Sequence, residues 1–97
     1  MRFESTRGES PKVSAPEALL AGAAPDGGLY LQDALPRLGH LMDAGLDYAG
    51  LAAAVFTALL PGFPEEELHQ AAKAAYPGAF DTKEVAPLTP LGEDFLL

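Results

Sequence analysis

Cysteine is absent from this sequence of 97 residues, which excludes a disulfide framework, a thiolate nucleophile and any zinc site built on cysteine. No apolar run approaches the roughly 20 residues that a membrane-spanning helix needs. The N-terminus also has neither the apolar region nor the small-residue cleavage site of a secretory signal. We therefore expect a cytoplasmic protein that makes no contact with a membrane.

Basic residues are scarce. Six lysines and arginines stand against 14 aspartates and glutamates, so the formal net charge is −8. This charge disfavours binding to a nucleic-acid backbone, and we expect no nucleic-acid partner. The balance is uneven, because residues 1–12 carry three basic and two acidic side chains and are the only mildly basic stretch.

Hydrophobic residues make up 48% of the sequence, too many for a disordered segment. A chain of this length forms one domain at most. It buries only roughly 60–65% of its unfolded surface, so it can fold with little stability to spare. We therefore expect residues 1–97 to be one small domain.

The clearest local signals lie near the N-terminus. Residues 3–6 predict a short strand. Ser14 and Glu17 have the spacing of a capping box, in which each side chain binds the other residue's backbone N–H. A helix is therefore expected from Ser14 to about residue 21, with Gly22 as its stop.

The rest of the chain predicts two longer helices and several short strands. Asp47 can cap a helix whose apolar residues recur at helical spacing. These residues predict one buried stripe, formed by Tyr48, Leu51, Ala52, Val55, Phe56, Leu59 and Leu60. A third helix is expected from Pro64 to the stop at residues 77–78. Its narrow apolar face comprises Leu68, Ala71, Ala72, Ala75 and Tyr76. The remaining elements are a turn at 25–28, a strand at 29–31, a weak helical turn at 36–46 and two strands around a turn at 92–94. The pattern predicts a small α+β domain of about three helices, an N-terminal strand and a C-terminal hairpin.

The last strand, residues 95–97, is apolar and has no polar stop. A domain evolved to stand alone should have covered or charged such an edge. We therefore expect the chain to be cut from a longer one. We also expect it to self-associate, through this edge or through a face that normally docks on another domain.

Catalytic chemistry is not visible in the residue pattern. His40 and His69 lie on separate segments without a ligand pattern, so no metal is expected. The lysines, at positions 12, 73 and 83, lie in polar contexts that would not activate a Schiff-base amine. Arg7 is the exception, because two hydroxyl residues and a glycine beside it could help it to hold an anion. The alternative is an exposed arginine near two glutamates.

Three motifs carry a family resemblance. "STRG" at 5–8, "EALLAGAAPDGGLYL" at 17–31 and "EVAPLTPLGEDFLL" at 84–97 resemble the N-terminal domain of threonine synthase. The segments "LDYAGLAAAV" and "PEEELHQAAKAAY" between them are also similar to that domain. The resemblance covers nearly the whole chain, and the ordered set of motifs is more specific than any one of them.

The resemblance implies a pyridoxal-phosphate (PLP) enzyme, a lyase of threonine biosynthesis that converts O-phosphohomoserine and water into threonine and phosphate. Its catalytic α/β domains would have the fold of tryptophan synthase β. In the family, the last strand continues into a "HGPT…FKD" segment whose lysine carries PLP, and this chain stops before it. The resemblance therefore implies that the chain alone binds no cofactor and is inactive. Its partner would be the catalytic domain of the same polypeptide.

The resemblance also suggests which residues face the substrate cleft of the full enzyme. The candidates are Ser5, Thr6, Arg7, Asp26, Gly27, Gly28 and Tyr30. The competing interpretation is that the two turns only fix how the first strand and helix pack. Two other functions stay open: a free-standing noncatalytic protein-interaction domain, and the front domain of a related PLP-dependent phospho-lyase.

Overall fold

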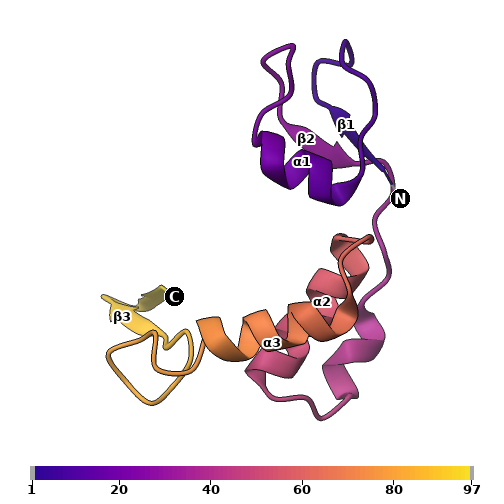
Figure 1. Ribbon diagram of the computed structural model, residues 1–97. Helices are drawn as coiled ribbons and strands as arrows, with labels where there is room; N and C mark the ends of the chain where they lie inside the picture. Colours follow the sequence, from indigo (N-terminus) through magenta and orange to yellow (C-terminus); the bar gives the residue numbers. More distant parts are fainter. Residues whose placement is uncertain (1, 97) are drawn as a thin grey trace.

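The computed structural model describes residues 2–96 and confirms a small α+β fold with three α-helices (Figure 1). The turn expected at 36–46 is a short 3-10 helix. In chain order the elements are β1 (Phe3–Ser5), α1 (Ala15–Ala21), β2 (Tyr30–Gln32), η1 (Gly39–Asp43), α2 (Tyr48–Leu59), α3 (Glu65–Ala75), β3 (Thr89–Leu91) and β4 (Asp94–Leu96).

Residues 2–33 form an N-terminal unit in which α1 covers one face of a two-stranded sheet (Figure 1). β1 and β2 are antiparallel, and Ser5 lies opposite Tyr30 in their register. Phe3 of β1 is buried against Ala15 and Ala18 of α1. The unit is therefore closed by one aromatic ring packed on the small side chains of a short helix.

The capping box predicted for α1 is present. The Oγ of Ser14 accepts from the backbone N–H of Glu17 at 3.4 Å, and a Glu17 carboxylate oxygen accepts from the Ser14 N–H at 2.8 Å. The Ser14 backbone and hydroxyl bonds lower the pKa of Glu17. Gly22 ends the helix with a φ of 72°. Start and stop were both predictable because both are written in local sequence.

α2 and α3 form a helical hairpin whose contact is made by alanines. Ala49 and Ala53 of α2 are buried against Ala72 of α3. At the end of the hairpin the rings of Tyr48 and Tyr76 meet edge to face, with centroids 4.9 Å apart. Small side chains at the crossing let the two helices approach closely.

The buried stripe predicted for α2 is wrong. Leu51 is 38% exposed and Tyr48 is 44% exposed, while the buried residues of this helix are Ala49, Gly50 and Ala53. The helical spacing correctly groups the large apolar residues, but α3 covers the row of small residues beside them. No element within residues 2–96 buries the stripe of large apolar residues fully.

The two units meet at the loop between α2 and α3. Leu60 and Phe63 pack against the cluster that contains Phe3. In the same loop, Gly62 lies against the ring of Pro16 in α1. The N-terminal unit therefore rests on one end of the helical hairpin.

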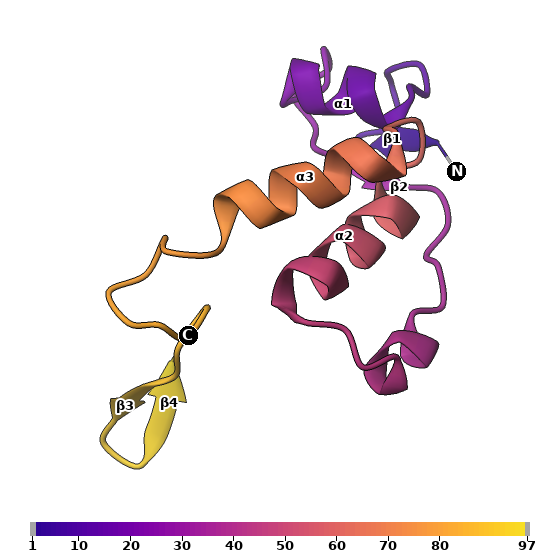
Figure 2. The same cartoon turned by 60° about the horizontal axis from the view of Figure 1, so that its bottom comes forward.

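The chain then leaves the helices and ends in the β3–β4 hairpin, which stands apart from α2 and α3 (Figure 2). Its register pairs Pro90 with Phe95. This confirms the expected C-terminal pair of strands, although Asp94 belongs to β4 and not to the turn. Residue 97 of the predicted last strand lies outside the described residues.

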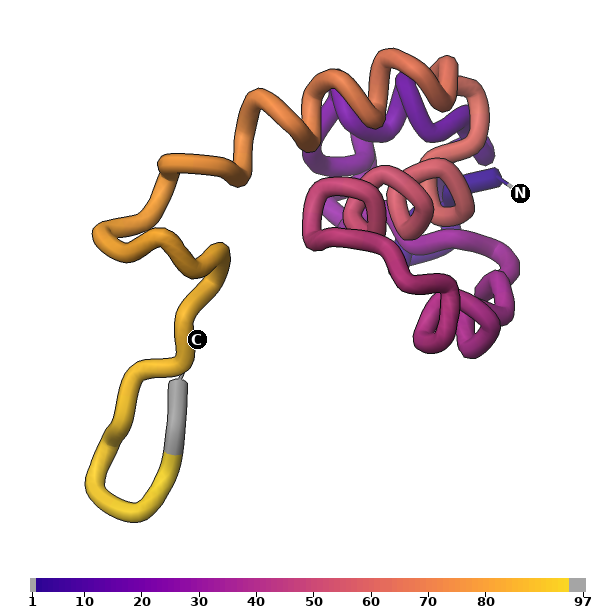
Figure 3. Tube along the Cα trace, turned by 90° about the horizontal axis from the view of Figure 1, so that it is seen from below, coloured from indigo at the N-terminus to yellow at the C-terminus, as the bar shows by residue number. Residues whose placement is uncertain are grey.

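The tube in Figure 3 shows that the segment after α3 extends away from the rest of the chain. The radius of gyration is 16.3 Å, against about 12.5 Å expected for a compact chain of this length. Among residues 2–94, the buried apolar residues are one phenylalanine and six alanines: Phe3, Ala15, Ala18, Ala24, Ala49, Ala53 and Ala72. Among the described helices, none has both the length and the apolar character needed to cross a membrane.

Candidate functional site

Asp26, in the turn before β2, is the centre of a polar cluster that joins this turn to the end of β1. Its Oδ1 accepts hydrogen bonds from the Ser5 hydroxyl at 2.7 Å and from the Gly28 N–H at 2.9 Å. Its Oδ2 accepts from the Glu9 N–H at 3.0 Å. Three donors from three parts of the chain thus converge on one carboxylate. We call this arrangement the Asp26 cluster.

These bonds lower the pKa of Asp26 to about 2. The Ser5 hydroxyl is the largest cause, and the Gly28 and Glu9 backbone N–H groups add to it, while desolvation opposes them. The carboxylate is therefore ionised throughout the physiological range. Its charge is directed inward, onto protein donors.

Arg7 lies on the edge of the Asp26 cluster. Its Nη1 donates to the backbone carbonyl of Asp26 at 3.0 Å, and its backbone N–H donates to the Ser5 hydroxyl at 3.1 Å. Arg7 is exposed, and within residues 2–96 it makes no ion pair. One N–H of the guanidinium thus fixes the side chain, and the others are available to an anion.

Gly28 allows the cluster to close. A Cβ at this position would overlap the Ser5 hydroxyl and would lie 3.0 Å from both Asp26 Oδ1 and Thr6 Oγ1. Gly27 beside it has a φ of 83°, which L side chains rarely adopt, and a Cβ there would lie 2.9 Å from Arg7 Nη1. Gly28 is therefore required by the close approach of its neighbours, and Gly27 by its backbone conformation.

Thr6 ties the same two segments together by a different route. Its backbone N–H donates to the Leu29 carbonyl at 2.8 Å, and its hydroxyl accepts from the Leu29 N–H at 3.0 Å. Tyr30 is half-buried and packs against the Phe3 cluster. The structure thus brings six of the seven candidate residues to one place, while Tyr30 joins the core beside them.

Sequence reasoning missed two contributors. The Glu9 backbone N–H binds the Asp26 carboxylate, and the Ser10 hydroxyl accepts from the Asp26 N–H at 3.2 Å. The only signal was a serine held extended by the proline after it, because such a residue can present its hydroxyl to a facing turn. That signal is too common to single out a site.

The described residues include neither a buried lysine nor a group of three metal-ligating side chains. Lys12 pairs with Glu4 at 3.4 Å and Asp33 at 3.6 Å, and the other two lysines are exposed. None of the three lysines therefore fits a buried Schiff-base amine. Residues 2–96 bring no three histidine, aspartate or glutamate side chains together as metal ligands.

Comparison with known proteins gives the family. A model described as "Threonine synthase N terminus" matches residues 2–76. The chain belongs to this family. It is 36% identical over 109 aligned residues to a threonine synthase of Methylobacillus glycogenes, covering all of this chain and 23% of that protein. It is 37% identical over 102 aligned residues to a threonine synthase of Pseudomonas aeruginosa, again covering all of this chain and 22% of that protein.

A solved structure shows the same fold. The crystal structure of PLP-bound threonine synthase from Brucella melitensis superposes on 99% of this chain with a TM-score of 0.81 and 37% identity. The match covers 22% of that enzyme. This chain thus spans between a fifth and a quarter of the length of its relatives. In those proteins the matching region is one part of a longer polypeptide.

Proposed function

We propose that this chain is the N-terminal region of a PLP-dependent threonine synthase that converts O-phosphohomoserine and water into threonine and phosphate. The observation that carries the proposal is the match of the whole chain, in sequence and in fold, to a threonine synthase crystallised with PLP. The motifs that resemble the family at residues 5–8 and 17–31 contain the Asp26 cluster.

In this proposal PLP is held by the part of the enzyme outside residues 1–97, since the lysines of this chain do not fit it. When bound, PLP supplies an electron sink for carbanions next to the substrate nitrogen. Residues 1–97 form the N-terminal domain and contact the catalytic domain of the same polypeptide. By themselves they are expected to be inactive.

The Asp26 cluster would face the cleft between this domain and the catalytic domain. Arg7 is the residue that would act on the substrate, because its guanidinium is exposed, fixed at one nitrogen and free to bind a phosphate or carboxylate. The phosphate of the substrate carries two negative charges. A fixed cation stabilises this charge in a cleft from which water is excluded. Ser5, Asp26 and Gly28 would position Arg7 and would not touch the substrate.

The test uses the full-length gene product that contains residues 1–97. The wild type should release phosphate from O-phosphohomoserine in the presence of PLP. Arg7→Ala should lower kcat/KM at least about tenfold, since a charge-assisted contact to substrate is lost. Arg7→Lys should recover part of it, because the charge remains and the planar fork is lost.

Arg37→Ala is the matched control, because Arg37 is also exposed and no hydrogen bond or ion pair within residues 2–96 involves it. This control should leave kcat/KM unchanged. If Arg7→Ala lowers Tm but not kcat/KM, the two turns only hold the fold together. A wild-type protein without phosphate release, or a gene that stops after codon 97, would overturn the proposed activity.

A further inference from the structure

α2 has an unusual composition for a helix with an open side. Its twelve residues, Tyr48–Leu59, include no charged side chain. A helix that is apolar all round is typical of a helix buried on all sides. α3, by contrast, carries three glutamates in its first turn and an exposed lysine, and therefore has one polar side. α2 thus has the composition of a central helix, while α3 has that of an outer one.

Within residues 2–96, the buried residues of α2 are Ala49, Gly50 and Ala53, and its other residues are half-buried or exposed. The Ala49 and Ala53 row packs on α3. The next row contains Tyr48, Ala52 and Phe56, and the row beyond it contains Leu51 and Val55. Together with Tyr76 these two rows line a hollow of about 250 Å³. We call this surface, formed by Tyr48, Leu51, Ala52, Val55, Phe56 and Tyr76, the α2 face.

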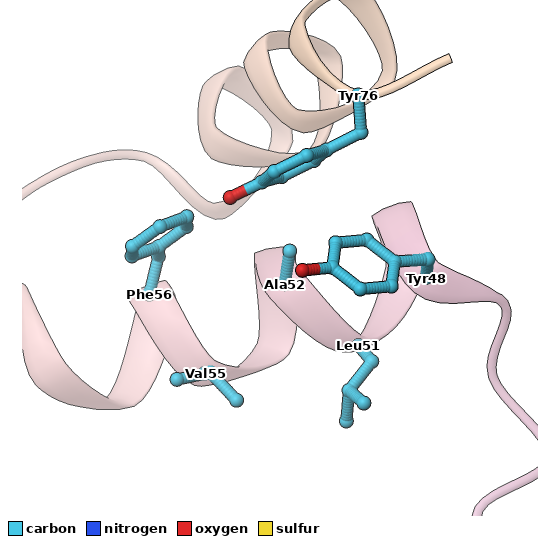
Figure 4. Close-up of a pocket in the computed structure, with 6 residues that line it drawn as sticks. All are labelled: Tyr48, Leu51, Ala52, Val55, Phe56 and Tyr76. Atoms are coloured by element: carbon cyan, nitrogen blue, oxygen red, sulfur yellow. The ribbon is translucent and has the colours of Figure 1, made fainter. Parts of the chain in front are cut away.

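Figure 4 shows how the α2 face is arranged. Tyr76 reaches from the end of α3 over α2, between Phe56 and Tyr48. Leu51 and Val55 project from α2 on the side away from Tyr76. The three aromatic rings therefore lie on one side of the α2 face, and the two aliphatic side chains lie beside them.

We propose that the α2 face is the surface on which the remainder of the same polypeptide docks, through an aliphatic or aromatic segment without charge. This proposal rests on the proposed function, since it takes residues 1–97 to be part of a longer enzyme. It adds which face of the domain makes the contact. The chemistry of the partner follows from α2 itself, which offers no charged side chain to pair with a charge on the partner.

The length of the relatives selects this occupant over a second copy of the chain. The relatives carry more than three quarters of their length outside the region that matches, so a large partner is tethered nearby. A tether of this kind gives an effective concentration in the millimolar range, which a free second copy rarely reaches. Within the described residues, Tyr48 and Leu51 of the α2 face are 44% and 38% exposed, so the docking segment can reach this face.

The first experiment is hydrogen exchange on the full-length gene product, followed over residues 48–60. In the wild type these amides should exchange slowly, because the hydrogen bonds of a docked helix open only when the docked segment separates from it. Leu51→Glu should raise their exchange rate at least about tenfold, since it forces a charge into the contact. Ala74→Glu is the matched control. It places the same charge on the exposed side of α3 and should leave the exchange of α2 unchanged.

The second measurement uses the wild type alone and so does not depend on a variant that folds. Hydroxyl-radical oxidation of Leu51 is compared between the native and the denatured full-length protein. Docking predicts at least tenfold slower oxidation in the native state, since a covered side chain is shielded from solvent. A reduction of only about two- to threefold is what the 38% exposure of Leu51 accounts for without a partner, and would overturn the proposal.

The outcomes separate docking from function. If Leu51→Glu halves the molar mass of the full-length protein in solution, the α2 face binds a second copy and the proposal is overturned. Unchanged exchange in Leu51→Glu would also overturn it. A wild type with a protected α2 face that releases no phosphate from O-phosphohomoserine would support docking while refuting the proposed reaction.

Discussion

The Ser5 hydroxyl donates a 2.7 Å hydrogen bond to Asp26, and this bond joins the end of β1 to the turn before β2. Ser5 is the one buried polar residue in the described part of the chain, at 5% exposure, and the bond gives its hydroxyl a partner. Buried hydroxyls without a partner are costly, so the bond and the burial depend on each other. The position of Arg7 follows from this pair, because it bonds to both residues.

Removing the Ser5 hydroxyl should raise the pKa of Asp26. In Ser5→Ala we expect the pKa to move from about 2 toward the ordinary value of 3.8, because Ser5 is the largest cause of the shift. An NMR titration of the aspartate carboxyl carbons measures this directly. Thr6→Ala is the control, since its hydroxyl binds Leu29 and not Asp26. An Asp26 pKa that stays near 2 in Ser5→Ala would contradict the assignment.

Asp26 should also give the protein an acid-labile component of stability. Its pKa is lower in the folded state than in the unfolded state. The stabilisation it provides is therefore fully present above about pH 4 and is lost as the pH falls through about 2. Urea unfolding of the wild type and of Ser5→Ala across this range should show the two free energies of unfolding converging as the pH falls. A difference that stays constant with pH would show that the Ser5 hydroxyl acts independently of the Asp26 charge.

Gly28→Ala should destabilise the protein by about 1–3 kcal/mol, because the new methyl group overlaps the Ser5 hydroxyl and crowds Thr6 and Asp26. Thermal unfolding measures the loss. Gly39→Ala is the matched control, since a Cβ at Gly39 meets no atom within 4 Å. Equal effects of the two substitutions would show that the Asp26 cluster can open to admit a side chain.

Ser14→Ala should cost about 1 kcal/mol of stability, because it removes the hydroxyl that caps α1. It should also raise the pKa of Glu17 in part, because the Ser14 backbone N–H, which is the larger cause of the low pKa, remains while the hydroxyl bond is lost. Ser14→Thr keeps an acceptor at the same place and should restore most of both properties. Chemical unfolding and a carboxyl titration report them separately, and a loss of stability without any change at Glu17 would argue against the bond between the Ser14 hydroxyl and the Glu17 carboxylate.

Ala72→Leu should weaken the contact between α2 and α3 by about 1–3 kcal/mol, since three alanines leave no room there for a branched side chain. Ala74→Leu places the same side chain on the exposed side of α3 and should be nearly neutral. Thermal unfolding compares the two. A stabilising Ala72→Leu would mean that the helices separate readily and that their alanines do not fix the spacing.

The sequence was sufficient wherever structure is set by neighbouring residues. α1 begins at its capping box and ends at Gly22, and α2 begins after Asp47, whose carboxylate accepts from the Gly50 N–H at 2.8 Å. Glycine is a poor helix former, and Gly50 lies in the first turn of α2. The structure explains it, because a Cβ there would lie 2.9 Å from the Asp47 carboxylate oxygen. The glycine thus makes room for the cap.

The sequence was insufficient wherever the answer depends on what lies across from a residue. Helical spacing grouped Leu51 with Val55, but it could not show that α3 would cover the alanines beside them. In the same way, the turns pointed to Arg7 and Asp26, yet nothing local indicated that the Asp26 carboxylate would be occupied by Ser5 and two backbone groups. Both failures concern contacts between segments that are distant in sequence.

The position of the Asp26 cluster near the N-terminus bears on how the protein is made. Every hydrogen bond of the cluster, together with the β1–β2 pairing, lies within the first 33 residues. Domains begin to fold during synthesis from the N-terminus. The nascent chain can therefore set Arg7 in place before the apolar helix α2 has emerged from the ribosome.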